Sequence, residues 1–517
     1  MTVPKRPSTK RFDRAPQANI QRSSFDLSFP YKTPFDSGRL VPLPPLEILP
    51  GDSFRLRMHA LARLATPLHP TLDNLYLESF FFFVPNRLVW ANWQKFMGEQ
   101  DNPGDSTDFT IPVMDTDTGG GYGEGGVPDY MGIPIGTNNV EHSALPLRAH
   151  NLCFNEWFRD ENLQDSLDVK TDDGPDLGGT YPLQRRGKRK DYITSCLPWP
   201  QKGPGVDLPL GDSAPIYAEN QSLTDFLVVE YGKGGTEQHM DTSLSQLTMA
   251  SGTSGANPLR ANLEEATAAT INDLRQAFQI QKLQERDARG GTRYTEILRA
   301  HFQVTSPDAR LQRPEYLGGG HTNILMQSVP QTSSTDATTP QGNLSAYGTG
   351  AIQGHGFTKS FVEHGYIIGF VSVRADLNYQ NRLDRHWSRK TKYDFYWPAL
   401  QALGEQPVYN REVWMDGTTA DDDVWGYQER WAEYRTQLGV ITSSFRSNAA
   451  ATLDPWHYAL DFQTRPALDD AFVVDTPPVK RTIAVQTEPE FLFDAWFDIK
   501  AARPMPIYSV PGYIDHF

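Results

Sequence analysis

A two-residue alternation of apolar and polar side chains is the clearest pattern near both ends of the chain. In residues 54–60, four apolar residues alternate with Arg55, Arg57 and His59. In residues 490–499, three phenylalanines and an alanine again occupy every second position. Successive side chains of a strand point to opposite faces, so this period predicts two half-buried strands.

Long apolar runs indicate two further strands. Residues 75–84 include four consecutive phenylalanines, and Pro85 follows them. Residues 364–374 form a second strongly apolar run. Near-continuous apolar runs are typical of strands covered on both sides, so we expect residues 75–84 to be buried on both faces.

Three segments have the spacing of helices. Residues 86–97 predict a short helix that Gly98 ends, and residues 147–158 predict a second helix. The longest helix is expected within residues 262–290. It would begin after Asn262, with Glu265 completing a capping pair, and end at a Gly-Gly pair.

The long helix should bury its apolar side. Residues 263–289 would span roughly 40 Å at 1.5 Å per residue. Leu274 and Phe278 fall near helical spacing, and we expect them to be buried, either on the β-sandwich or against a neighbouring subunit.

Loops and insertions separate these elements. Residues 101–149 are loop-like up to the second helix, and the glycines of 318–320 and the Ser/Thr tract 332–339 are also expected in loops. Residues 216–261 are polar and weakly patterned, as in a surface insertion. Strand signals at both ends favour a single β-sandwich over residues 23–517 with large insertions, rather than serial domains.

Composition supports a mainly β protein. The 517 residues include 41 Gly and 39 Pro, which suits strands joined by long loops, and only 21% are charged while 11% are aromatic. Few charges and many aromatics suit a protein that buries surface against copies of itself. Cys153 and Cys196 are expected to be buried, reduced thiols. We expect neither a signal peptide nor a membrane span.

No catalytic, cofactor-binding or metal site is expected. The sequence lacks a phosphate-binding P-loop, the nucleophile motif GxSxG, the zinc motif HExxH and a dinucleotide-binding glycine pattern. The acidic triplet 421–423 lacks the alternating spacing of a calcium loop, so a solvated acidic turn is the preferred interpretation.

Two basic segments are candidate nucleic-acid contacts on a chain whose formal net charge is −15. The first is an N-terminal arm, residues 1–22, for which phosphate neutralisation is the favoured interpretation. The second is a run of five cations within six residues, for which DNA binding and a solvated or acid-paired loop are equally supported. The candidates are Lys5, Arg6, Lys10, Arg11, Arg14 and Arg22 in the arm, and Arg185, Arg186, Lys188, Arg189 and Lys190 in the run.

Several longer strings resemble segments of the major capsid proteins of gokushoviruses, which are microviruses, small icosahedral single-stranded-DNA bacteriophages. The likeness runs nearly end to end. The strings are residues 195–204, 269–283, 285–296, 305–320, 354–359, 393–398 and 502–506.

This resemblance implies an eight-stranded jelly roll with long insertions and a non-enzymatic, structural role. It implies about 60 copies in a T=1 shell around circular single-stranded DNA, formed in the cytoplasm of a bacterial host together with other virion and scaffolding proteins. Residues 216–261 would be the counterpart of a variable insertion that forms threefold protrusions and contacts a host surface receptor. A jelly roll also pairs its first and last strands, which would place residues 54–60 beside 491–497.

The competing hypothesis is a phage-encoded polysaccharide-degrading enzyme on a β-scaffold. Such an enzyme needs paired carboxylates facing one cleft, and with 63 acidic residues in the chain the sequence alone leaves that pair open.

Overall fold

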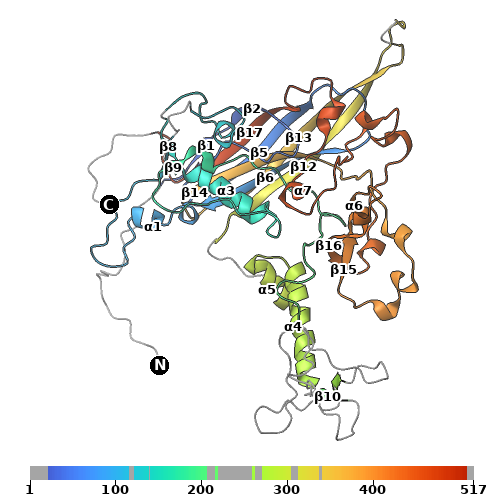
Figure 1. Ribbon diagram of the computed structural model, residues 1–517. Coiled ribbons are helices and arrows are strands. Elements are labelled where there is room, and N and C mark those ends of the chain that lie inside the picture. Colours follow the sequence, from blue (N-terminus) through green and yellow to red (C-terminus); the bar gives the residue numbers. More distant parts are fainter. Residues whose placement is uncertain are drawn as a thin grey trace, which may run out of the picture. The chain divides into compact units, whose positions relative to one another are not determined.

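The computed structural model describes residues 21–115, 121–138, 140–206, 216–218, 259–261, 271–303, 312–336 and 340–508 (Figure 1). The chain divides into two compact units. The first contains residues 1–200 and 306–517, and the second contains residues 201–305.

A curled antiparallel sheet of ten strands forms the body of the first unit. Eight strands follow the order β1-β17-β5-β13-β12-β6-β14-β3, while β2 pairs with β17 and β4 with β14. The strands are β1 (Ser23–Asp26), β2 (Phe29–Phe35), β3 (Val41–Pro42), β4 (Leu46–Ile48), β5 (Ser53–Leu64), β6 (Leu75–Pro85), β12 (Glu315–Pro330), β13 (Leu344–Ser360), β14 (Gly365–Ala375) and β17 (Phe491–Arg503). The predicted class, a β-sandwich of the jelly-roll type with long insertions, is confirmed.

The predicted contact between the two ends of the sequence is also confirmed. β17 runs antiparallel to β5, with Ala495 opposite Ala60 and Phe497 opposite Met58. Both strands alternate buried and exposed residues along nearly their whole length, as the period of two predicts.

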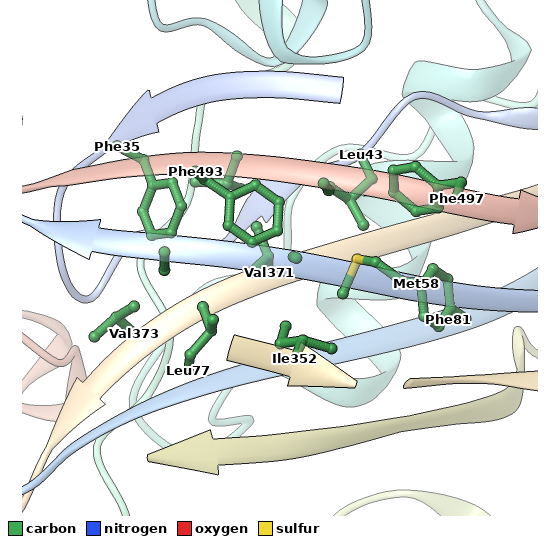
Figure 2. Packing of buried hydrophobic residues seen from close by; sticks show 14 of the residues in the cluster. Phe35, Leu43, Met58, Leu77, Phe81, Ile352, Val371, Val373, Phe493 and Phe497 are labelled. Atoms are coloured by element: carbon green, nitrogen blue, oxygen red, sulfur yellow. The ribbon is translucent and has the colours of Figure 1, made fainter. Parts of the chain in front are cut away.

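The main hydrophobic core lies between the two halves of the curled sheet (Figure 2). β5 and β17 contribute Met58, Phe493 and Phe497 from one half, and β6 and β14 contribute Phe81 and Val371 from the other. Because these side chains belong to one cluster, the sheet closes on itself as a sandwich does.

A second cluster covers the opposite face of β6 and β14. Helix α3 (Leu145–Trp157) packs Phe154 and its other apolar residues against Phe82 and Phe370. Phe81 and Phe82 therefore point into different cores, and the prediction that this strand is buried on both faces is confirmed. The helix predicted at residues 147–158 is α3.

Smaller elements decorate the first unit. The short strands β7 (Val113–Asp115), β8 (His142–Ser143) and β9 (Asp176–Leu177) form one small sheet, and β15 (Glu405–Tyr409) pairs with β16 (Val424–Glu429) in another. A third cluster, which includes Val408, Trp425 and Phe472, packs around the second small sheet. The short helices are α1 (Trp93–Phe96), α2 (Val127–Tyr130), α6 (Asn410–Val413) and α7 (Asp470–Val473).

Two predictions of local structure are wrong. Residues 86–97 form a 3-10 turn at Asn86–Leu88 and the four-residue helix α1 rather than one helix, because the amide of Ala91 between them donates to the carbonyl of Thr171 instead of to its own turn. The glycines of 318–320 lie inside β12 rather than in a loop, paired with β6.

Those glycines are explained by the close approach of β6. A Cβ atom on Gly319 would lie 2.1 Å from the carbonyl oxygen of Ser79. Glycine within a strand often marks such a close backbone approach.

The second unit contains a two-stranded pairing and two helices. β10 (Ile216–Ala218) runs antiparallel to β11 (Leu259–Ala261), with Ile216 opposite Ala261. Helix α4 (Ile271–Arg289) contacts α5 (Tyr294–Phe302) through a hydrogen bond of 2.6 Å between the His301 ring and the Asp287 carboxylate. The predicted start of the long helix, residues 262–270, lies outside the described residues.

Leu274 and Phe278 are exposed on α4, with Phe278 59% accessible. The expectation that the chain's own sandwich buries them is therefore wrong, and burial against a neighbouring subunit stays a prediction. None of the helices in the described ranges is long and apolar enough to cross a membrane.

Candidate nucleic-acid interface

The N-terminal arm joins the sheet at its edge. Lys5, Arg6, Lys10, Arg11 and Arg14 lie outside the described residues, and Arg22 is described. The guanidinium of Arg22 donates a 3.3 Å hydrogen bond to the hydroxyl of Ser53, the first residue of β5. β1 follows directly and pairs with β17, so the arm ends where the sheet begins.

The basic run 185–190 lies between two segments that are distant in the sequence, residues 37–38 and 473–475. The amide of Arg186 donates to the carbonyl of Gly38 at 2.8 Å, and the amide of Lys188 donates to the carbonyl of Val473 at 2.8 Å. The guanidinium of Arg185 donates to the carbonyls of Ser37 and Asp475, each at 3.4 Å. The backbone of the run 185–190 is therefore hydrogen-bonded to the rest of the first unit, unlike that of a free surface loop.

Arg186 lies in a buried charge cluster around Glu78. Its guanidinium contacts the Glu78 carboxylate and lies over the Phe80 ring, 4.5 Å from the centroid. Arg374 on β14 binds the same carboxylate through two nitrogens, each at 3.1 Å. Burial lowers the pKa of Arg186 to about 8, and the neighbouring charge of Arg374 acts in the same direction.

Lys188 and Asp475 are the most enclosed charged groups of this region. The ammonium group of Lys188 donates to the backbone carbonyl of Phe472 and lies 4.2 Å from the centroid of the Phe472 ring. Burial lowers the pKa of Lys188 to about 8. Burial also raises the pKa of Asp475 to about 6, although Arg374, Lys188 and Arg186 oppose that shift.

Arg189 and Lys190 keep part of their side chains in solvent. Arg189 lies 4.0 Å from the Tyr76 ring centroid and within 3.5 Å of Glu78, while Lys190 pairs with Asp160. An open pocket of about 550 Å³ lies beside them. It is lined by Tyr76, Glu78, Lys188, Arg189, Lys190, His321 and Arg374.

The acidic and cysteine side chains that the structure describes can be compared with the expectations from the sequence. Within the described ranges, no group of three or more His, Cys, Asp or Glu side chains could hold a metal ion. The acidic turn 421–423 is solvated at Asp422 and Asp423, as expected, but Asp421 is buried and pairs with Arg465 at 2.8 Å. Cys153 and Cys196 are free and buried, as predicted.

Comparison with known proteins decides the identity of the chain. Residues 14–513 match the family described as capsid protein (F protein). The chain is 44% identical to capsid protein VP1 of Bdellovibrio phage phiMH2K, with 100% of each chain covered. It is 41% identical to capsid protein VP1 of Chlamydia phage 1, with 97% of each covered, and 35% identical to that of Spiroplasma virus 4, with 96% covered.

The chain belongs to the capsid protein (F protein) family.

As a capsid protein of the gokushovirus type, it is a structural protein of the virion that assembles with copies of itself, and it is not an enzyme. The polysaccharide-degrading alternative is thereby set aside. The resemblance found in the sequence strings is confirmed over nearly the whole chain.

For this capsid protein, the structure separates the candidate DNA contacts into two groups. Arg185 and Lys188 donate to backbone carbonyls and Arg186 contacts Glu78, so these three are occupied inside the chain. Arg189 and Lys190 also contact carboxylates, of Glu78 and Asp160, but they keep part of their side chains exposed in the open pocket. Sequence reasoning missed Glu78 and Arg374, and the one signal for Glu78 was a charged residue beside an otherwise apolar phenylalanine run.

Proposed function

We propose that about 60 copies of this capsid protein form a T=1 shell that encloses circular single-stranded DNA. The observation that carries the proposal is the match to capsid proteins over the full chain length, at 44% identity to one of them. A subunit with a formal net charge of −15 repels DNA phosphates, so cations must lie between shell and genome. Metal ions, polyamines or a separate basic virion protein supply some of them, and inward-facing basic groups of the subunit supply the rest.

The arm is the main source of those cations. Residues 1–22 carry six basic side chains and one acidic side chain. They bind phosphates by charge and not by base identity, so they suit a genome of any sequence. Arg189 and Lys190, whose pocket is open, are the second contribution among the candidate residues.

Other partners complete the proposal. Residues 216–261 contact a host surface receptor, and further virion and scaffolding proteins act during assembly in the bacterial cytoplasm. The support for a protruding segment is the β10–β11 pairing, which brings its two ends together.

Imaging of purified particles tests the shell. A reconstruction should show icosahedral particles with 60 subunits for T=1, the arm on the inner surface, and residues 216–261 on the outer surface. Nucleic acid extracted from them should be degraded by a nuclease specific for single-stranded DNA. Empty particles, or an arm on the outer surface, would contradict the proposal.

A salt titration tests the arm. Replacing Lys5, Arg6, Lys10, Arg11 and Arg14 with Gln should leave folding intact and weaken binding to an oligothymidylate. It should also flatten the slope of log affinity against log salt by up to ~0.7 for each phosphate that the variant no longer binds. The control replaces five exposed cations outside the arm, Lys282, Lys390, Lys392, Arg435 and Lys480, with Gln, and should keep the slope. Equal slopes for the arm variant and wild type would reject this role of the arm.

A further inference from the structure

The outward face of β5 presents a row of cations. The strand alternates strictly, so one set of side chains fills the core and the other set is exposed. The exposed set consists of Arg55, Arg57, His59, Leu61 and Arg63. A half-buried strand usually exposes mixed polar residues, so three arginines in one row form a concentrated positive strip.

An exposed indole lies beside this row. Trp496 of β17 stands directly opposite His59 in the antiparallel register, and it is 49% accessible. Leu492, on the same outward face, is opposite Arg63. The strip therefore has an aromatic surface near its centre and an apolar residue near one end.

The carboxylates on this face are already paired with other cations. Their ion pairs are Lys32 with Asp494 at 2.8 Å, Arg55 with Asp498 at 3.3 Å, and Lys500 with Asp26. Arg57 and Arg63 form no ion pair with any described residue. These two arginines leave the face with positive charge that the subunit does not neutralise.

The basic arm meets the same face. Ser53, which receives the hydrogen bond from Arg22, lies two residues before Arg55 and hence on the same side of the strand. Arg22, the described basic residue of the arm, therefore lies at the end of the row of arginines.

We propose that single-stranded DNA lies across the outward face of β5 and β17, with a base stacked on Trp496 and phosphates bound by Arg57 and Arg63. The two arginines are six residues apart, about 20 Å along the strand, and Trp496 is opposite a residue between them. An aromatic platform between cations is the arrangement that binds single strands without sequence preference. The proposal rests on the proposed function, because it assumes that the shell encloses DNA.

A second copy of the chain fits this face less well. The centres of protein–protein interfaces are depleted in charge, whereas Arg57 and Arg63 would enter such a contact without carboxylate partners from their own subunit. Backbone phosphates supply the missing negative charge. The charges of the face therefore favour DNA over a second subunit.

Binding of a fluorescein-labelled oligothymidylate to the full-length subunit tests the site. Trp496→Ala should weaken the affinity about 5-fold or more, the range expected for loss of one stacked base. The double substitution Arg57→Gln with Arg63→Gln should flatten the salt slope by about 1.4, or ~0.7 for each phosphate contact. Matched controls are Trp387→Ala, another exposed tryptophan, and Lys390→Gln with Lys392→Gln, which remove the same charge from the segment between β14 and β15. Both controls should bind as wild type does.

Ultraviolet cross-linking of purified particles gives an independent measurement, and the peptide containing Trp496 should carry a nucleotide adduct. Wild-type affinity in both test variants, with binding still weakened in the arm variant, would overturn this site and leave the proposed function standing. Unchanged affinity with failure of particle assembly would assign the face to subunit association instead. Particles without single-stranded DNA would overturn the proposed function itself.

Discussion

Arg148 donates two hydrogen bonds of 2.8 Å to the carboxylate of Asp176, and both side chains are fully buried. The pair joins α3 to β9, and the same guanidinium donates to the carbonyls of Val89 and Asp172. Tyr181 donates a further hydrogen bond of 2.5 Å to Asp176. One buried ion pair therefore ties α3 to the loop that precedes it, through Val89, and to the loop that follows it, through Asp172, Asp176 and Tyr181.

Removing one partner of this pair should strongly destabilise the subunit. Arg148→Met leaves the buried Asp176 carboxylate with the more distant Lys170, at 3.9 Å, as its cation. We expect a loss of about 3–5 kcal/mol in the free energy of unfolding. Urea denaturation measures the loss. Lys32→Gln breaks the exposed pair with Asp494 and should change stability by less than about 1 kcal/mol. Similar values for both variants would contradict the structural role of Arg148.

Asp475 should make the subunit less stable as the pH rises. Its pKa is about 6 in the folded protein and 3.8 as the ordinary value, because burial disfavours its charged form. Between these two values the folded state binds more protons than the unfolded state, so the free energy of unfolding falls with rising pH.

Asp475→Asn removes this titration. From about pH 4 to about pH 7, wild type should lose about 3 kcal/mol relative to the variant, as expected for a shift of roughly two pKa units. Denaturation curves of both proteins at matched pH values measure the difference. A constant difference across that range would show that Asp475 titrates normally in the folded protein.

Substitutions of the adjacent residues Phe493 and Leu492 test the predicted alternation of buried and exposed side chains along β17. Phe493 is 2% accessible and Leu492 is 58% accessible. Phe493→Ala should cost about 3–5 kcal/mol, since it leaves a cavity in the main core. Leu492→Ala should stay within about 0.5 kcal/mol of wild type. Thermal melts compare the two, and a reversed order would place the wrong face of β17 in the core.

Gly319→Ala should disturb the pairing of β12 with β6. The new methyl group would meet the Ser79 carbonyl oxygen at 2.1 Å, and overpacking of this kind costs at least about 1–3 kcal/mol. Gly123→Ala is the control, because nothing lies within 4 Å of its added Cβ. Calorimetry of the two variants measures the effect, and equal melting temperatures would refute the close contact.

The segment 216–261 should be dispensable for folding. Ala218 pairs with Leu259, so residues 219–258 can be replaced by a short Gly/Ser turn between the paired strands. We expect a cooperative melt like that of wild type, while assembly or infectivity is impaired. Loss of cooperative unfolding would show that the segment belongs to the core.

Strands with alternating or continuous apolar residues could be predicted from the sequence. Burial of one face selects apolar residues at every second position, and burial of both faces selects a continuous apolar run. β5, β6, β14 and β17 are of this kind. The sequence did not predict β12, because its glycines indicated a loop. Gly319 is needed there for the close approach of the β6 backbone, which is distant in the sequence. β2 escaped because Pro30 and Pro34 interrupt its alternation; they are tolerated there because β2 lies at the edge of the sheet.

The basic run shows a second limit of local reasoning. Five cations in six residues look alike whether they meet phosphates or buried carboxylates. The partner of Arg186 is Glu78, which is 108 residues away in the sequence. Only the folded sheet brings the two together, so charge density alone could not choose between the alternatives.

The position of β17 sets the timing of folding during synthesis. This strand lies inside the sheet, beside β5 on one edge and β1 and β2 on the other. More than 400 residues separate β5 from β17 in the sequence, so at about 5–20 residues per second a ribosome needs roughly 20–90 s between them. Throughout that interval the edge of β5 that pairs with β17 in the folded protein lacks its partner strand. The nascent chain therefore depends on protection from aggregation, and a shell-forming surface arises only once synthesis is nearly finished.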